Sequence, residues 1–405
     1  MSKCRICSNG IAPFISFGRM PIANGFLLRE QFKDEYFFEL RAAFCSKCKM
    51  VQLIDQPDTE RMFHENYAFI SSTSSRMQVH YREFAGHVIK DYLRSSDPFV
   101  VEVGSNDGIM LKNFARLKIR HLGIEPSANV AKTAVDNGVK TICDFFDERL
   151  AGDLIKEYGQ ADAFLGANVM CHIPNLNSVI AGIKMLLKPD GIVIFEDPYL
   201  ADVIEKTSYD QIYDEHVFLF SVSSIIYAFA QYDMELIDIE PQTTHGGSMR
   251  YLLANKGARP ISGNVRAQLE KEEGLGLDRT ETYDRFRDNC GRSKKDLISL
   301  LKRLKKEGRR VVGYAATSKS TTVVNYCGIG PDLVEFISDT TPIKQGKFSP
   351  GMHIPVLPYR EFENNYPDYA LLFAWNHEAE IMAKERRFIE GGGKFILYVP
   401  EVHIK

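Results

Sequence analysis

An alternation of apolar strands with helices constrains this chain more than any other feature of its sequence. It begins at DPFVVEVGSNDGIMLKNF, where a β-branched strand over residues 99–103 runs into a glycine-rich turn and then a helix. A further helix is expected before it, through roughly residues 77–94. Strands follow at HLGIEP, KTICDFF, ADAFLGANV, GIVIFEDP, ELIDIEP and GSMRYLLAN. Helical sequence separates the earlier strands, so the pattern predicts βα units and a parallel sheet of seven strands, the last two adjacent in sequence.

The alternation restarts after a charged, helix-prone stretch over residues 266–308. RRVVGYAA, LVEFISD, YALLFAW and KFILYVP are expected to be strands of a second doubly wound α/β domain. A chain of 405 residues is too long for one ordinary core, which agrees with several domains. We place the domain boundaries at residues 1–75, 76–256 and 257–405, the first after the polar stretch SSTSSR.

Composition excludes several classes of partner. The chain is 44% hydrophobic and 25% charged, as soluble globular proteins are, and its net charge is −3 without a long basic run. Neither nucleic acid nor an acidic membrane surface is therefore an expected partner. No apolar segment approaches the roughly 20 residues that span a bilayer. The N-terminus, MSKCRICSNG, lacks an apolar secretory stretch, so we expect a cytoplasmic protein.

Four of the eight cysteines form two C-x-x-C pairs, Cys4 with Cys7 and Cys45 with Cys48. Two such knuckles supply four thiolates to one tetrahedral zinc ion, and four sulfur ligands leave no open position for catalysis. We therefore predict a small zinc-binding domain with a structural Zn²⁺. The aromatic stretch EYFFELRAAFC is expected to form a strand against the second knuckle. The alternative is four reduced cysteines in a small core.

The turn after the first strand of the central domain discriminates between cofactors. A dinucleotide fingerprint requires G-x-G-x-x-G, but here Asn106 stands where the second glycine would approach a pyrophosphate. S-adenosylmethionine has no pyrophosphate. Together with the strand count, the turn favours an S-adenosylmethionine methyltransferase core, which is Rossmann-like, over a nicotinamide enzyme. The second strand ends at Glu125, where an acid accepts hydrogen bonds from ribose hydroxyls.

The remaining cofactor candidates follow the ends of strands. Gly104, Asn106 and Asp107 are candidates for contact with the methionine and ribose portions of the cofactor. Asp144 and Phe145 are candidates for the adenine, and Asn168 is a candidate for the methionine portion.

The C-terminal domain has its own strand-to-helix loop, Ala315-Ala316-Thr317-Ser318-Lys319. A lysine beside a helix N-terminus suits a diphosphate, although it is equally well a solvated side chain in an ordinary turn. Lys319, Asn325 and Lys344 are the candidates for binding a diphosphate and its base. Trp375, the only tryptophan, ends a strand and either stacks on the base or fills the core.

A cluster of titratable groups occupies SYDQIYDEHVFLFS, residues 208–221, within sequence that otherwise looks like core. Burying so many such groups is costly unless they pair or act in catalysis. Tyr213, Glu215 and His216 are therefore singled out as site residues.

In their order along the chain, the zinc knuckles, EVGSNDG, GIEP, YDQIYDEH, THGGSMR, GYAATSKSTTVVNYCGI and SDTTPIKQGKFSPGMHIPV resemble the nucleotide-sugar C-methyltransferases of branched-chain deoxysugar biosynthesis. The resemblance spans nearly the whole chain. It implies a zinc-bearing N-terminal domain, a central S-adenosylmethionine domain, and a C-terminal Rossmann-like domain that holds the sugar nucleotide. The substrate implied is a nucleoside-diphosphate 4-keto-6-deoxy sugar, with dTDP first and GDP second. We expect a monomer, because one chain is able to build the cleft.

The resemblance also implies methyl transfer to C-3 through an enolate, because the ketone at C-4 acidifies the neighbouring C–H. It groups Tyr67, His172, Tyr213, Glu215 and His216 as one active-site set. His216 is the expected base, since neutral imidazole is available near pH 7. Tyr67 and Tyr213 offer phenol donors to the enolate oxygen or the sugar. Relatives commonly carry His at the position of Asp214.

Several alternatives stay open at this point. An O- or N-methyltransferase acting on a nucleotide-linked sugar would use the same fold, and so would a sugar-nucleotide binding protein without catalysis. His245, before a glycine pair, is either a substrate contact or part of a turn at the sheet edge. Tyr67 would serve equally as an aromatic packed between domains.

Overall fold

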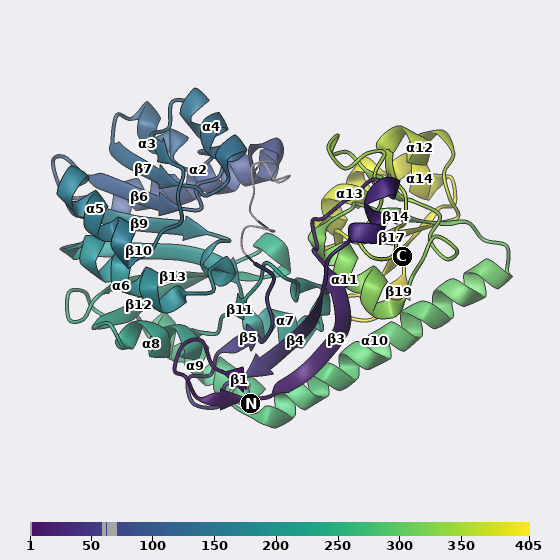
Figure 1. Cartoon of the computed structure of the whole chain (residues 1–405), viewed down its shortest axis with the longest axis horizontal. Coiled ribbons are helices and arrows are strands. Elements are labelled where there is room, and N and C mark those ends of the chain that lie inside the picture. Colours follow the sequence, from purple (N-terminus) through teal and green to yellow (C-terminus); the bar gives the residue numbers. More distant parts are fainter. Residues whose placement is uncertain (1, 59–61, 63–70) are drawn as a thin grey trace.

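The structure is a computed structural model that describes residues 2–58, 62 and 71–405. Its elements form two large sheets with a smaller four-stranded sheet between them (Figure 1), and β1 (Ser2–Lys3) and β2 (Gly10–Ile11) form a separate two-stranded sheet. Tyr67 lies outside the described residues, so its predicted role stays a prediction. Within the ranges described, there is no helix with the length and apolar character that crossing a membrane requires.

The central sheet has seven strands in the order β8-β7-β6-β9-β10-β13-β12. The strands are β6 (Phe99–Val103), β7 (Arg120–Ile124), β8 (Thr141–Ile142), β9 (Ala161–Ala167), β10 (Leu187–Pro198), β12 (Met234–Gln242) and β13 (Ser248–Asn255). The predicted count, with its last two strands adjacent in sequence, is confirmed. The expectation of a parallel sheet is corrected, because β13 runs antiparallel to both β10 and β12. The connection over residues 243–247 is too short for a crossover, so β12 and β13 form a hairpin.

Helices cover both faces of this sheet. One face packs against α5 (Glu148–Tyr158), α6 (Leu176–Leu186) and α8 (Val222–Ala230). The other face packs against α2 (Ser75–Asp91) and α3 (Lys112–Arg116). The helix expected over 77–94 is α2, which begins at the cap Ser74, whose side chain accepts the backbone N–H of Met77. Helices α4 (Ala128–Asp136), α7 (Leu200–Lys206) and α9 (Gly263–Leu275) complete this part.

The C-terminal sheet has six strands in the order β16-β15-β14-β17-β18-β19. The strands are β14 (Val311–Tyr314), β15 (Ile337–Asp339), β16 (Val356–Pro358), β17 (Tyr369–Leu372), β18 (Lys394–Leu397) and β19 (His403–Ile404). Only β19, at the edge, is antiparallel to its neighbour. Its helices are α11 (Ser318–Cys327), α12 (Tyr359–Asn364), α13 (Glu378–Lys384) and α14 (Arg386–Glu390). Numbered along the chain, the strand order is 3-2-1-4-5-6, that of a Rossmann fold.

A four-stranded sheet joins the N-terminal part to the middle of the chain. Its order is β11-β5-β4-β3, with β3 (Pro13–Pro21), β4 (Phe37–Phe44), β5 (Val51–Leu53) and β11 (Phe218–Leu219). The strand expected in EYFFELRAAFC is β4, which ends one residue before Cys45. Because β11 follows the titratable cluster directly, its pairing with β5 holds that cluster beside the N-terminal segment.

The long helix α10 (Thr280–Lys306) connects the two large sheets along one edge of the molecule (Figure 1). Its Tyr283 stacks on Phe44 with ring centroids 4.4 Å apart, while Leu297 and Leu301 are buried in the core shared with the C-terminal sheet. The N-terminal strands, this helix and the C-terminal sheet therefore share one hydrophobic core. The domain boundaries stated above stay predictions.

Candidate active site and zinc site

A cavity of about 390 Å³ is lined by residues from the N-terminal, central and C-terminal parts of the chain. Its walls come from the N-terminal segment, the carboxyl ends of the central strands and the N-terminus of α11. The predicted site residues in these walls are Gly104, Asn106, Glu125, Asp144, Phe145, Asn168, His172, Tyr213, Glu215, His216, His245, Lys319 and Lys344. Asp107 and Asn325 are not among the lining residues. One cavity thus brings together most of the candidates from two domains.

Glu125 organises the cofactor end of the cavity. Its carboxylate accepts the backbone N–H of Asn106 at 3.0 Å and that of Ser127 at 2.8 Å. Burial raises its pKa, and these two N–H donors oppose the rise. The residue at the strand end therefore ties the glycine-rich turn to the next turn of the sheet, on the wall where a ribose would lie.

The two glycines of the turn are required by its conformation. Gly104 has a φ of +61°, and a Cβ there would meet Val169 at 2.5 Å. Gly108 has a φ of +78°, and a Cβ there would meet Val139 at 2.7 Å. Asn106 also has a positive φ, 49°, which asparagine tolerates better than most residues. A larger side chain would therefore not fit at Gly104 or Gly108 in this turn.

Glu102 lines the cavity and was missed at the level of sequence. It is almost fully buried, and its Oε2 has no hydrogen-bond partner among the described residues. Burial, with the charges of Glu125 and Asp107, raises its pKa well above the usual range. An acid inside the otherwise apolar strand FVVEV was the available signal. A buried carboxyl group that faces a cavity suits a cationic ligand group.

His216 lines the cavity in a defined tautomer. Its Nδ1 lies 2.7 Å from the carbonyl oxygen of Gln211, which only accepts, so Nδ1 carries the proton. Nε2 is then the basic nitrogen, and the Tyr213 hydroxyl donates to it at 2.8 Å. Burial, followed by the nearby His172, lowers the pKa of His216 well below its ordinary value. The imidazole is therefore neutral at physiological pH.

Glu215 and His172 flank this pair. His172 Nδ1 lies 3.9 Å from Glu215 Oε2, and the rings of His172 and His216 have centroids 5.2 Å apart. Burial lowers the pKa of His172 to about 4, so this imidazole is also neutral near pH 7. Asn24, from the N-terminal segment, donates to Glu215 Oε1 at 2.6 Å. The structure thus gathers His172, Tyr213, Glu215 and His216 within one polar cluster.

Asp214 is not among the residues that line the cavity. Its Oδ1 accepts the backbone N–H of Ala23 at 3.0 Å. Burial and then the neighbouring Glu215 raise its pKa well above the usual range. The residue therefore anchors the N-terminal segment to the cluster.

Two lysines and a histidine form the opposite wall. Lys319 Nζ donates to Asn376 Oδ1 at 3.2 Å, and burial lowers its pKa to about 8 against the opposing charge of Asp210. Lys344 Nζ donates to the carbonyl of Ala316 at 2.8 Å, and burial lowers its pKa as well. Burial lowers the pKa of His245 to about 3. This wall carries the positive charge that an anionic ligand would meet.

Trp375 and Asn325 are engaged in packing. Trp375 Nε1 donates to Asp210 at 2.7 Å, and its ring covers Gly246, where a Cβ would meet it at 2.2 Å. This contact explains the first glycine of THGGSMR, while a Cβ at the second, Gly247, would meet Asp202 at 2.3 Å. Asn325 donates to the carbonyl of Pro350 at 3.0 Å and lies under that loop. Neither side chain lines the cavity.

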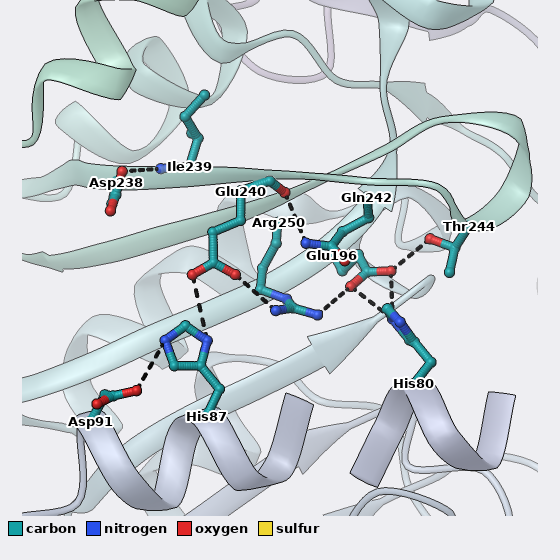
Figure 2. A network of polar contacts seen from close by, with 10 residues as sticks. All are labelled: His80, His87, Asp91, Glu196, Asp238, Ile239, Glu240, Gln242, Thr244 and Arg250. Atoms are coloured by element: carbon teal, nitrogen blue, oxygen red, sulfur yellow. Dashed lines mark hydrogen bonds and ion pairs between the residues drawn. The ribbon is translucent and has the colours of Figure 1, made fainter. Parts of the chain in front are cut away.

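A network of buried ion pairs and hydrogen bonds surrounds Glu196, and one of its members, Thr244, lines the cavity (Figure 2). Glu196, at the carboxyl end of β10, accepts from His80 at 2.9 Å, Thr244 at 2.7 Å and Arg250 at 3.0 Å. Burial alone would raise the pKa of Glu196, but His80 and Arg250 outweigh it and leave the pKa lowered. Arg250 also pairs with Glu240 at 2.8 Å. One carboxylate therefore ties α2, β10 and β13 to the turn that carries His245.

The four cysteines of the two knuckles form one cluster. All four sulfur atoms lie within 4.8 Å of one another, with Cys4 3.5 Å from Cys48 and Cys7 3.5 Å from Cys45. A tetrahedral zinc with bonds of about 2.3 Å separates its sulfur ligands by about 3.8 Å, so the cluster fits this ion. Gln52 Nε2 donates to Cys4 Sγ at 3.0 Å and supplies an outer hydrogen bond to the ligand set. The predicted zinc ligands are thus brought together.

Cys171, His172 and His216 also have potential metal-ligating atoms within 4.8 Å of one another. Both ring nitrogens of His216 are already hydrogen-bonded, to Tyr213 and to the Gln211 carbonyl. In this arrangement neither nitrogen of His216 is left for a metal ion.

Comparison with known proteins agrees with a zinc site in the N-terminal part and a methyltransferase fold in the central part. Residues 4–63 match the family model described as "Putative zinc binding domain", residues 77–239 match "Methyltransferase domain", and residues 243–400 match "C-methyltransferase C-terminal domain". The chain is 31% identical to C-methyltransferase NovU of Streptomyces niveus over 409 residues, which cover 100% of this chain and 97% of the relative.

Solved structures similar to the chain include an S-adenosylmethionine-dependent methyltransferase from Anabaena variabilis, with 14% identity and a TM-score of 0.36 over 44% of this chain and 86% of that one. A magnesium protoporphyrin IX methyltransferase from Synechocystis with bound S-adenosylhomocysteine has 12% identity and a TM-score of 0.34, over 44% of this chain and 83% of that one.

The fold and the matched domains define an S-adenosylmethionine-dependent methyltransferase with an N-terminal zinc-binding region and a second α/β sheet. Within that class, the chain belongs to the C-methyltransferase family that includes NovU. Carbon as the acceptor, which the sequence left open against oxygen or nitrogen, is thereby supported.

Proposed function

We propose that the chain methylates C-3 of a nucleoside-diphosphate 4-keto-6-deoxy sugar through an enolate, in branched-chain deoxysugar biosynthesis. The observation that carries this proposal is the neutral His216, whose basic Nε2 faces Tyr213 inside the cavity. The same cavity is lined by Glu125 on the cofactor side and by Lys319 on the other. A base placed between two ligand sites is what carbon methylation of an activated sugar needs.

Sugar carbons are poor nucleophiles, so this chemistry needs a carbanion equivalent. A ketone at C-4 makes the C-3 proton removable and gives an enolate. His216 Nε2 takes that proton once the Tyr213 hydroxyl turns from it toward the sugar oxygen, where a phenol donor stabilises negative charge. The hydrogen bond from Nδ1 to the Gln211 carbonyl holds the ring in the tautomer that keeps Nε2 basic.

The cofactor supplies an electrophilic methyl group on its sulfonium when it is bound. Residues at the ends of β6 and β7 fit this ligand, Glu125 for the ribose hydroxyls and Glu102 for the ammonium of the methionine portion. Asp144 and Phe145 lie on the same wall and suit the adenine. Phe145 is 45% exposed, so an unpaired aromatic face is available for stacking.

The nucleotide of the sugar substrate suits the wall formed by the N-terminus of α11, Lys319 and Lys344. A helix N-terminus with two lysines favours a diphosphate. We propose dTDP ahead of GDP, because the enzymes that this chain resembles most often use dTDP. We also propose that a monomer is active, since one chain supplies every wall described here.

The test is methyl transfer from labelled S-adenosylmethionine to a panel of nucleotide-linked 4-keto-6-deoxy sugars in deuterium oxide, with wild type beside His216→Ala. We expect a C-3-methylated product from wild type and deuterium exchange at C-3 without cofactor. Both should fall by roughly 100-fold or more in the variant. Methylation of the reduced 4-hydroxy sugar instead would identify an O-methyltransferase. A variant that still exchanges and methylates would move the base to His172 or a tyrosine.

A further inference from the structure

The turn over residues 22–25 brings an amide side chain into the active site from a distant part of the sequence. The N–H of Gly25 donates to the carbonyl of Ile22 at 3.0 Å and closes the turn. Asn24, the third residue of this turn, lines the cavity. Its Nδ2 donates to Glu215 Oε1 at 2.6 Å, across 191 positions of sequence. A hydrogen bond to a carboxylate from an amide at this distance is short and charge-assisted.

The turn is held on both sides by parts of the site. The backbone N–H of Ala23 donates to Asp214 Oδ1 at 3.0 Å, and the hydroxyl of Thr321 on α11 donates to the Ala23 carbonyl at 2.8 Å. Asp214 and Thr321 are both buried. The position of Asn24 is therefore set jointly by the stretch that carries His216 and by the helix that faces the proposed nucleotide.

Glu215 has two oxygens with different neighbours. Oε1 accepts from Asn24, while Oε2 lies 3.9 Å from His172 Nδ1. A carboxylate held at one oxygen cannot rotate freely, so the contact with Asn24 restricts where the other oxygen points. A small displacement of a catalytic group changes rates strongly.

We propose that Asn24 is a positioning residue that acts through Glu215, holding this carboxylate toward His172 and the sugar. The inference rests on the proposed function, because the inference places Glu215 at the reacting end of the cavity. It makes the N-terminal segment a working part of the active site. The competing explanation is that Asn24 only suits the turn.

The experiment compares Asn24→Asp and Asn24→Gly with wild type, and uses Lys33→Ala, an exposed residue of the same segment, as the matched control. Asn24→Asp keeps the shape but faces Glu215 with a second carboxylate, and Asn24→Gly keeps the turn but removes the donor. The readouts are kcat, KM for each substrate, the pH profile, zinc content and thermal stability, using the ketosugar that wild type accepts.

We expect kcat to fall by roughly 10- to 100-fold in both variants, with KM for S-adenosylmethionine and zinc content unchanged. In Asn24→Asp, the acid side of the pH profile should also move to higher pH, because two adjacent carboxylates resist ionisation. Lys33→Ala should match wild type in every readout.

If both variants keep the kcat and the pH profile of wild type, the proposal is overturned and Asn24 is a turn residue only. The proposal is also overturned if both variants lose zinc or thermal stability together with activity, because Asn24 would then be needed for folding. Failure of wild type itself on every ketosugar would contradict the proposed function instead. The same variants would then judge Asn24 on whichever acceptor wild type methylates.

Discussion

At the scale of single residues, burial decides the charge of the groups in the cavity. It keeps His172, His216 and His245 neutral, lowers the pKa of Lys319 to about 8, and raises that of Glu102 well above its usual range. Histidines that stay unprotonated are available as bases through the physiological range. The residue types were visible in the sequence, but their protonation states depend on surroundings that only the fold provides.

Lys319 gives a prediction for the alkaline side of the pH profile. In the free enzyme, Lys319 is charged below about pH 8 and neutral above it. If it binds the diphosphate, kcat/KM for the sugar nucleotide should fall as pH rises through 8, while kcat is affected less. Lys319→Met should lower kcat/KM by roughly 10- to 100-fold and flatten this limb. Lys306→Met, an exposed lysine on α10, is the control, and an unchanged limb in Lys319→Met would exclude the role.

At the scale of elements, the carboxyl ends of strands are held in place by buried polar groups. Glu196 joins β10 to α2, to β13 and to the turn before it (Figure 2). Asp210 accepts from Trp375 and Tyr398 at 2.7 Å each, which attaches the stretch before His216 to the C-terminal sheet. The loops that carry the site are thereby fixed by contacts between elements, not by local sequence.

Glu196→Gln tests the network in Figure 2. We expect the free energy of unfolding at pH 7 to fall by about 3 kcal/mol, because Arg250 and His80 lose a buried charged partner. The folded-state pKa of Glu196 lies below its ordinary value of 4.5, so this stabilisation is present above pH 4.5 and is lost as pH falls through the lowered value. Denaturant unfolding of both proteins across pH measures it. A difference that does not shrink in acid would contradict this account.

At the scale of the whole molecule, three parts of the chain that are far apart in sequence line one cavity. The N-terminal segment contributes Asn24 to its wall and the four cysteines to a zinc cluster. β11 is paired with β5, so the stretch after His216 belongs to the N-terminal sheet although it is distant in sequence. Loss of the zinc cluster should therefore also lower the activity of the site.

Cys48→Ser tests this coupling. We expect one zinc per chain in wild type by metal analysis and less than one in the variant, with a Tm lower by on the order of 10 °C. Methyl transfer should fall together with zinc content. Cys143→Ser, an exposed cysteine outside the cluster, should keep its zinc. Full activity in a zinc-free variant would show that the cavity does not depend on the knuckles.

The sequence by itself determined the fold class, the zinc ligands and many of the polar residues that line the cavity. These are local signals, because strand–turn–helix periodicity, C-x-x-C spacing and an acid at a strand end each reside in a few neighbouring residues. The antiparallel β13 follows from a short connection, so it too was locally encoded, though it was not predicted.

Only the tertiary structure decided which distant groups meet. Asn24 lies 191 positions from Glu215, and Glu196 is 116 positions from His80. Asn325, predicted to bind the nucleotide, lies in packing contacts outside the cavity lining. Trp375, for which stacking on the base and filling the core were both open, also lies outside the lining. The physical reason is that hydrogen bonds and burial act over a few ångströms in space, whatever the separation along the chain.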